Sequence, residues 1–285
     1  GFQLCRLQCR IAALFTRKKS NRPFKDYYAE WLRTLKNTLL PLLSESISSP
    51  TPILSLIATH VESLHQHFQS YYEALDLAAT HDVSQLLFPE WRNSLEKPFL
   101  WLGDFHPYLF TNLVRSFLED DEEDEGEEEG DGDEGRSIKE VRRNLEVIGR
   151  SWRVSMAWKN SSKSLVSRMD QIECGLRLMV PALVNRWRDA QAGLIERIGA
   201  GWGTVDGRRE GGKALIGQAV TAQMEELVSV FADANRLRSS VLSDILSALN
   251  VYQAALFLEG MAQFLVGFSD PDLLAEFERS KLTLS

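Results

Sequence analysis

The sequence predicts an all-α protein, a single helical-bundle domain of long antiparallel helices with an acidic loop between two of them. Apolar residues recur every three or four positions through several long windows, and no window shows the two-residue alternation of a half-buried strand. A dense run of carboxylates then interrupts the helical pattern. With 285 residues, of which 44% are hydrophobic and 25% charged, the chain can bury a sizeable core.

We predict three parts along the chain. Residues 1–22 are a basic arm, residues 23–270 form the helical domain, and residues 271–285 form a C-terminal tail. The acidic loop, residues 119–135, is inserted into the domain. No apolar run reaches the roughly 18 residues that a membrane span requires, and the first residues lack the apolar core of a signal peptide. We therefore expect an intracellular protein whose cysteines are reduced.

The first predicted helix begins at Phe24, and its apolar stripe continues to Leu42. Because proline lacks a backbone N–H and clashes with the preceding turn, we expect Pro41 to bend or end this helix. Residues 44–52 are rich in Ser and Pro and predict a loop. From Ile53 to Ala79 the apolar positions follow a heptad seam, so a second helix is expected to pack against the first.

The next stretch is rich in aromatic residues and is interrupted by proline and glycine. Between Pro89 and Pro107 this composition predicts short helices and turns. Large aromatic side chains supply much of a core, and a carboxylate among them needs a partner. We therefore predict three buried aromatic residues and one paired carboxylate, namely Trp91, Trp101, Phe105 and Glu96.

Helical periodicity resumes after the acidic run. It predicts one helix over residues 138–152 and a longer one from Leu165 to Trp187. We expect a kink in the longer helix at Pro181, because an internal proline breaks the hydrogen-bond ladder.

The last part of the chain predicts a loop and two further helices. Residues 199–213 contain six glycines and predict the loop. The apolar pattern then predicts helices over residues 214–234 and 237–268. Pro271 is expected to stop the second of them.

The acidic run is the most unusual feature of the sequence. Residues 119–134 hold 13 acidic residues out of 16, and like charges at this density predict a solvated loop. Carboxylates also attract hard cations such as calcium, although the ordered ligand spacing of a calcium loop is missing. A plain spacer and a weak divalent-cation site both stay open, and we predict no other cofactor. The candidate ligands are Glu119, Asp120, Asp121, Glu122, Glu123, Asp124, Asp131, Asp133 and Glu134.

Several motifs partly match known phosphate-binding, metal-binding or catalytic sites, but their spacing or surroundings do not fit such sites. Residues 207–214 nearly match a phosphate-binding loop, but Ala214 replaces the metal-binding hydroxyl and no buried strand precedes the loop. His60 and His67 are too far apart on one helix to share an ion. Cys174 has no histidine within a helical turn to activate it. We therefore expect no catalytic site and no enzyme.

Three blocks of the sequence carry recognisable motifs. The first runs from Phe24 to Trp31 and includes Leu35, the second spans His67 to Pro107, and the third runs from Ala232 to Leu258. Together they resemble the Delay-of-Germination domain of land plants, which also forms the C-terminal part of the TGA-type bZIP transcription factors. The motif positions are occupied by Trp31, Trp91, Glu96, Trp101, Gly103, His106, Pro107, Asp233, Arg238 and Gln253. Of these His106, and also Asp104 beside it, depart from the Arg and Gly that the family often has there.

The acidic insertion and the sequences of residues 24–28, 89–96 and 103–108 resemble the Inaperturate Pollen branch of that family. This resemblance implies a non-enzymatic pollen factor that gathers at plasma-membrane domains and, with protein partners, keeps the outer wall from being deposited there. For the basic arm, contact with anionic lipid and a disordered terminus both stay open. We expect a cytoplasmic, membrane-peripheral scaffold. A nuclear transcriptional co-regulator and a small-ligand or metal sensor stay open, whereas the scattered basic residues do not predict direct DNA binding.

Overall fold

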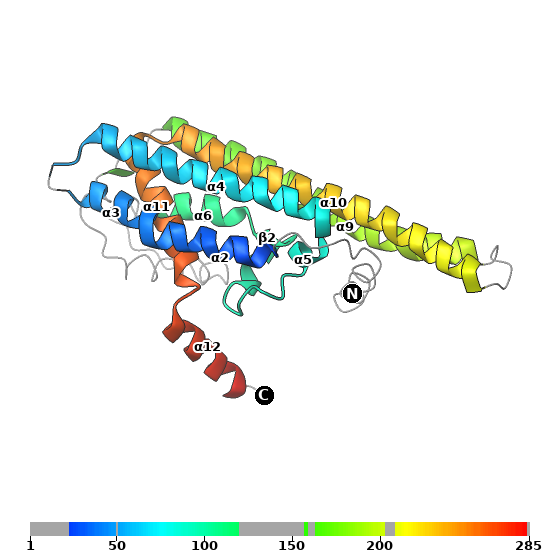
Figure 1. The fold of residues 1–285 in the computed structure, drawn as a ribbon. Coiled ribbons are helices and arrows are strands. Elements are labelled where there is room, and N and C mark those ends of the chain that lie inside the picture. Colours follow the sequence, from blue (N-terminus) through cyan, green and yellow to red (C-terminus); the bar gives the residue numbers. More distant parts are fainter. Residues whose placement is uncertain (1–22, 50, 120–156, 159–162, 203–208, 284–285) are drawn as a thin grey trace. The chain divides into compact units, whose positions relative to one another are not determined.

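The protein is all-helical, as predicted, in the computed structural model, which describes residues 23–49, 51–119, 157–158, 163–202 and 209–283 (Figure 1). Beyond the helices, the described residues form one pair of two-residue strands. The elements are α2 (Phe24–Thr34), the π-helix η1 (Leu35–Leu39), α3 (Leu40–Ser48), α4 (Leu54–Asp82), α5 (Ser84–Leu87), the 3₁₀-helix η2 (Lys97–Phe99), β1 (Leu100–Trp101), β2 (Asp104–Phe105), α6 (Tyr108–Glu119), α9 (Lys163–Trp202), α10 (Arg209–Ala248), α11 (Val251–Gly267) and α12 (Pro271–Thr283).

The chain is organised in two compact units. The described residues of unit 1 come from 1–29, 70–106 and 177–239, and those of unit 2 come from 30–69, 107–176 and 240–285. The long helices α4, α9 and α10 contribute one segment to each unit. The predicted helix over residues 138–152, most of the acidic loop and the basic arm lie outside the described residues.

Unit 1 contains two apolar clusters that join α9 to α10. Leu183 of α9 packs with Val230 and Ala234 of α10, and Leu194 packs with Ala219 and Val220. From the first cluster to the second, the residue numbers increase along α9 and decrease along α10. These two segments therefore run antiparallel, as predicted.

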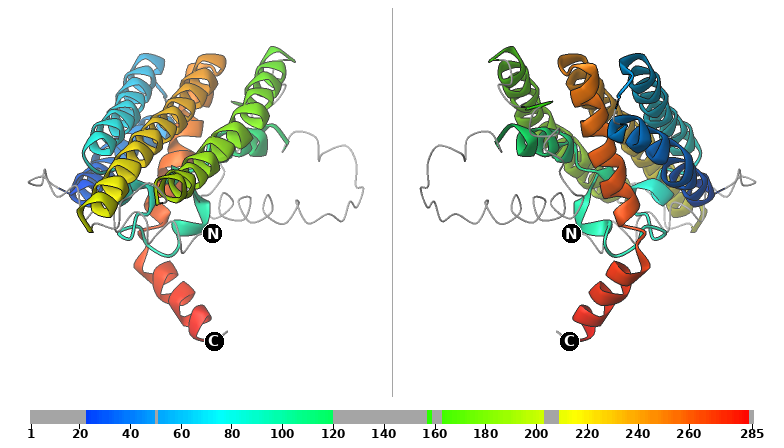
Figure 2. Two further views of the ribbon diagram at one scale, coloured as in Figure 1. Left: turned by 90° about the vertical axis from the view of Figure 1, so that its right-hand side faces the viewer. Right: turned by 90° about the vertical axis from the view of Figure 1, so that its left-hand side faces the viewer.

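Unit 2 is built around α11, which packs against α3, η1 and α6 (Figure 2). Ten of its 17 residues are buried, because neighbours surround a helix that is apolar on almost every side. No described helix alone combines the length and apolarity that crossing a bilayer requires. The bent pair Val251–Gly267 and Pro271–Arg279 meets both criteria together, and the burial of α11 in unit 2 accounts for its apolarity.

The first helix differs from its prediction near Pro41. The chain stays helical from Phe24 to Ser48, with a π-helical turn over Leu35–Leu39, and Pro41 lies in the first turn of α3. The π-helical turn before Pro41, in which Leu40 N–H donates to Leu35 O, changes the hydrogen-bond ladder just where proline has no N–H to donate. The predicted Ser-rich loop is therefore shorter. Ser46 donates to Leu43 O within the helix, at 2.8 Å, so its hydroxyl does not compete with the helix.

The break before the last core helix also lies elsewhere than predicted. Instead of ending near residue 234, α10 continues to Ala248. Asn250 then begins α11, because its side chain accepts from Gln253 N at 2.9 Å and the Gln253 side chain accepts from Asn250 N at 3.1 Å. This reciprocal capping box fixes the helix start. The three-residue spacing of Asn250 and Gln253 is visible in the sequence, but the apolar periodicity continues through it, so the helix start was not predicted there.

The predicted glycine-rich loop and C-terminal tail are both partly helical. α9 extends through Pro181 to Trp202, and α10 already begins at Arg209, so the predicted loop over residues 199–213 is shorter at both ends. Residues 271–283 of the predicted tail form α12, which Pro271 begins. Asp270 Oδ1 accepts from Asp272 N and Leu273 N, both at 3.0 Å, which caps this helix.

Candidate functional site

The most constrained place in unit 1 is the β1–β2 hairpin, whose two-residue turn is Leu102–Gly103. Leu100 pairs with Phe105 and Trp101 with Asp104, in antiparallel register. Both turn residues have positive φ, 44° for Leu102 and 91° for Gly103, as in the tight turns that join twisted strands. Sequence patterning predicted no strand, because two-residue strands are too short to show an alternation.

The turn is held in this conformation by its surroundings. Leu102 is only 7% exposed and packs with Leu183, Val230 and Ala234 of unit 1, so its burial offsets the strain of a positive φ. A Cβ on Gly103 would lie 2.6 Å from Leu86 O, which leaves room for glycine alone.

Arg238 of α10 inserts its guanidinium among the carbonyl groups of the hairpin. It is 0% exposed, and its Nε donates to Phe105 O at 2.9 Å. Its Nη2 donates to Trp101 O and, at 3.3 Å, to Leu102 O. Its Nη1 donates to Asn235 Oδ1 at 2.8 Å, one turn away on the same helix. Burial lowers the pKa of Arg238, but an arginine stays charged in proteins, so the hairpin carbonyls solvate a buried cation.

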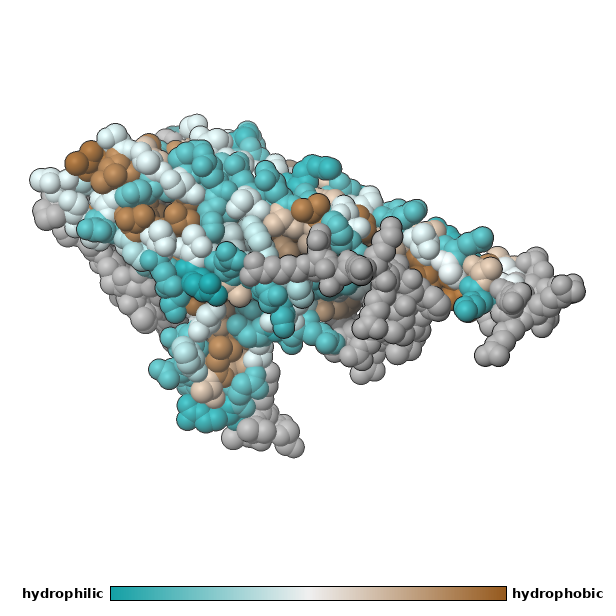
Figure 3. Space-filling view, viewed as in Figure 1, coloured by the Kyte–Doolittle hydropathy of each residue, from teal (hydrophilic) through white to brown (hydrophobic). Residues whose placement is uncertain are grey.

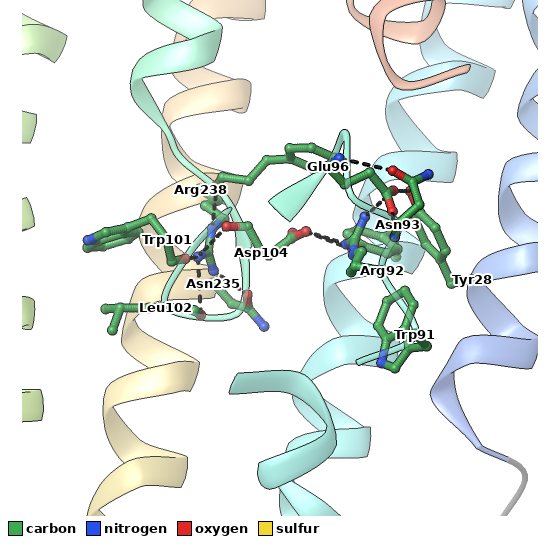
Figure 4. Close-up of polar contacts among 12 residues, drawn as sticks. Tyr28, Trp91, Arg92, Asn93, Glu96, Trp101, Leu102, Asp104, Asn235 and Arg238 are labelled. Carbon is green, nitrogen blue, oxygen red and sulfur yellow. Dashed lines mark hydrogen bonds and ion pairs between the residues drawn. The ribbon is translucent and has the colours of Figure 1, made fainter. Parts of the chain in front are cut away.

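Arg92 is the second buried arginine and pairs with two carboxylates. Its Nη1 donates to Glu96 Oε1 at 3.0 Å, and its Nη2 donates to Asp104 Oδ1 at 2.7 Å. Each carboxylate also accepts from a tyrosine hydroxyl: Tyr28 donates to Glu96 at 2.7 Å, and Tyr71 donates to Asp104 at 2.9 Å. Figure 4 shows Asp104 lying between the two arginines.

The positive and negative charges of this cluster are equal in number. Two guanidinium groups, Arg92 and Arg238, face two buried carboxylates, Glu96 and Asp104. Burial, the largest cause, raises the pKa of Tyr28 and of Tyr71, so both hydroxyls keep the protons that they donate. We call the six residues Tyr28, Tyr71, Arg92, Glu96, Asp104 and Arg238 the arginine cluster.

The arginine cluster is suited to holding structure together. Its charged groups already bond to one another or to backbone carbonyls, and they tie α2, α4, α10 and the hairpin of unit 1 together. Within the described ranges, no group of three or more His, Cys, Asp or Glu residues is placed to hold a metal ion. The cluster therefore fixes the shape of unit 1.

The predicted burial of the aromatic stretch is confirmed in part. Phe105 is 6% exposed, and Glu96 is 3% exposed and paired with Arg92. The prediction was wrong for Trp91 and Trp101, which are half-buried. Each indole covers a guanidinium, with ring-to-Cζ distances of 4.8 Å for Arg92 over Trp91 and 5.2 Å for Arg238 over Trp101. The arginines, rather than the indoles, take the innermost positions.

The other motif residues do not all meet in one place. In unit 2, the indole of Trp31 stacks on His67 with centroids 4.8 Å apart, and its Nε1 donates to His67 O at 2.9 Å. Gln253 belongs to the α11 cap, and Pro107 precedes α6. In unit 1, Asp233 pairs at the surface with Arg186 at 2.5 Å.

His106 lies beside the hairpin but outside its hydrogen-bonded core. Its ring centroid is 5.3 Å from that of Trp101. Burial, and secondarily the charge of Arg238, lowers the pKa of His106 to about 4, so this imidazole is neutral at physiological pH. The candidate calcium ligands lie outside the described residues, apart from the backbone of Glu119 at the end of α6.

The sequence interpretation missed the residue at the centre of the site, Arg92. A usable signal existed, because Arg92 and Glu96 have the four-residue spacing of a helical ion pair inside an apolar, aromatic stretch. Tyr71 and Asp104 had no comparable signal, because they lie 33 positions apart and meet only in the folded chain.

Comparison with known proteins supports the resemblance. The seed dormancy control family, DOG1, matches residues 39–116. Protein INAPERTURATE POLLEN1 of Arabidopsis thaliana is 45% identical over 278 residues, which cover 93% of this chain and 97% of that protein. The INAPERTURATE POLLEN 1 homolog of Oryza sativa subsp. japonica is 31% identical over 268 residues, covering 92% and 91%. Transcription factor TGA7 of Arabidopsis thaliana is 30% identical over 97 residues, covering 34% and 26%.

The all-helical fold and its match to the seed dormancy control family thus define a plant protein with a DOG1-type domain. The chain belongs to the INAPERTURATE POLLEN1 family, because the similarity extends over nearly the full length of both proteins.

Proposed function

We propose that this chain is a non-enzymatic factor in pollen aperture formation. The observation that carries the proposal is the 45% identity to INAPERTURATE POLLEN1 along 97% of that protein, whose name denotes pollen without apertures. The arginine cluster supports a non-catalytic role, because its charged groups are committed to hydrogen bonds and ion pairs within unit 1.

The proposed mechanism is that of a peripheral scaffold at plasma-membrane domains. The helices of the two units would present their surfaces to protein partners, and the basic arm would contact anionic lipid. The half-buried and exposed apolar side chains of the described helices provide surface that a partner can cover.

Expression in Arabidopsis plants that lack INAPERTURATE POLLEN1 tests this proposal. We expect the chain, fused to a fluorescent protein, to restore apertures and to gather at restricted plasma-membrane patches in developing pollen. The matched comparison is a Gly175→Ala fusion, since Gly175 is exposed and a Cβ there meets no atom within 4 Å. If the fusion with the natural sequence accumulates to the same level as the Gly175→Ala fusion but restores no apertures, the proposed role is refuted.

A transcriptional co-regulator is the second candidate, favoured by the partial similarity to transcription factor TGA7. The two candidates differ in location. A fusion that restores apertures from the nucleus alone would replace the membrane scaffold with this alternative.

Deleting residues 1–22 is expected to weaken binding to vesicles that contain anionic lipid. Each Arg or Lys near an anionic surface contributes about 1 kcal/mol, and the arm carries six. Co-sedimentation of the full chain and the deletion variant with anionic and neutral vesicles at low salt measures the effect. Equal binding of both proteins to anionic vesicles would exclude the arm as the lipid contact.

Replacing residues 119–134 with a Gly/Ser segment of equal length is expected to remove weak calcium binding. Calcium prefers carboxylate oxygens as ligands, and the replacement removes 13 carboxylate groups. Titration calorimetry at millimolar calcium should show heat for the natural chain alone. Because closure entropy depends weakly on length, shortening the segment should change the free energy of unfolding by about 1 kcal/mol or less. If calcium produces no heat with either protein, the segment is only a spacer.

A further inference from the structure

The connection between α3 and α4 exposes an uncharged surface of unit 2. Residues 51–56 are all exposed, and Ile53 and Leu54 are 61% and 60% exposed. From Ser46 to Val61 the sequence contains no Asp, Glu, Lys or Arg. Figure 3 shows apolar side chains gathered where α3 meets α4.

This connection also holds an unusual pair of dipeptides. Of the nine prolines, only Pro50 and Pro52 follow a hydroxyl-bearing residue, Ser49 and Thr51 respectively. Thr51 and Pro52 are both exposed and lie outside any helix or strand. Within the part of the chain that the structure describes, the Thr51 hydroxyl makes no hydrogen bond, so it is available to an enzyme.

We propose that Thr51 is a phosphorylation site for a proline-directed protein kinase. The kinase would transfer the γ-phosphoryl group of Mg·ATP to Thr51 Oγ1. An oxygen–phosphorus bond forms at the threonine, the bond to the β-phosphate breaks, ADP leaves, and the hydroxyl proton passes to a base of the kinase. The residue after the acceptor is proline, and a proline favours the extended backbone of a peptide bound in a kinase cleft.

The local structure gives this modification a physical consequence. Ile53 O accepts from Leu56 N at 3.0 Å and from Ile57 N at 3.1 Å, so Ile53 is the N-cap residue of α4. Isoleucine has no side-chain acceptor for the free N–H groups of the first turn. A phosphate two residues earlier adds a charge of about −1.5 to −2 near the positive end of the helix dipole.

The same charge changes the exposed surface. The phosphate would lie beside Ile53, Leu54 and Leu56, where charged residues are otherwise absent from 16 consecutive positions. Modification therefore turns an apolar surface into an anionic one while strengthening the start of α4. This inference does not depend on the proposed role in pollen, so the two can fail separately.

Incubation of the full chain with a recombinant mitogen-activated-class kinase and radiolabelled Mg·ATP tests the site. We expect Thr51→Ala and Pro52→Ala each to lower phosphate incorporation at least fivefold. Thr59→Ala is the matched control, because Thr59 is exposed on α4 but donates to Ser55 O at 2.9 Å and precedes His60. Incorporation unchanged in Thr51→Ala, or fragment ions that place the phosphate on Ser49 alone, would overturn the proposal.

Hydrogen exchange of the phosphorylated chain tests the consequence. A favourable dipole interaction of about 0.3–1 kcal/mol corresponds to roughly two- to fivefold slower exchange of amides in the first turn of α4. Amides in the middle of α4 should not change. Equal or faster exchange in the first turn would overturn the stabilising effect.

Discussion

Replacing Arg92 with methionine is expected to lower the free energy of unfolding by about 3 to 5 kcal/mol, because the change leaves two buried carboxylates without their cation. Arg92 is 2% exposed, and it pairs with Glu96 at 3.0 Å and Asp104 at 2.7 Å. Methionine matches much of the side-chain volume, so the loss reports charge rather than a cavity. Urea unfolding followed by circular dichroism measures it.

The matched control for Arg92→Met is Arg168→Met. Arg168 pairs with Asp244 at 2.9 Å, but its side chain is 44% exposed, so the loss there should be about 1 kcal/mol or less. Adding Glu96→Gln and Asp104→Asn to Arg92→Met should recover part of the stability, since neither amide is a buried charge. Equal stabilities of Arg92→Met and Arg168→Met would show that the arginine cluster does not hold unit 1 together.

Periodicity in the sequence located the helices well where one face is continuously apolar. The predicted helix from Ile53 to Ala79 corresponds to α4, and the one from Leu165 to Trp187 lies within α9. Helix ends were less predictable, because they depend on single side chains. A π-helical turn lets the chain remain helical past Pro41, and Asn250 caps α11 inside an uninterrupted apolar pattern.

The arginine cluster was only partly predictable for a different reason. The family resemblance identified Glu96, Gly103 and Arg238 as motif residues, but it did not indicate what they contact. Arg238 donates to Phe105 O, 133 positions away, and such a contact leaves no local periodicity. A buried arginine also has the same sequence signature as a surface one. The spacing of Arg92 from Glu96 is a weak signal, because Arg115 and Glu119 have the same spacing.

The conformation of the hairpin turn leads to the second large expected effect. Replacing Gly103 with alanine should lower the free energy of unfolding by about 2 to 4 kcal/mol, from left-handed backbone strain and overpacking together. The new Cβ would lie 2.6 Å from Leu86 O and 2.8 Å from Phe231 Cε2. A backbone oxygen cannot rotate away as a flexible side chain can, so the hairpin itself must shift.

That shift would also disturb the carbonyl groups that receive Arg238, so the effect of Gly103→Ala should extend to the arginine cluster. Gly175→Ala is the matched control, because Gly175 is exposed within α9 and a Cβ there meets no atom within 4 Å. Alanine in a helix interior is favoured over glycine by about 1 kcal/mol, so this variant should be slightly more stable. Urea unfolding of both variants should therefore give changes of opposite sign. If Gly103→Ala were as stable as the natural chain, the positive φ and the close approach of Leu86 O would not constrain the turn.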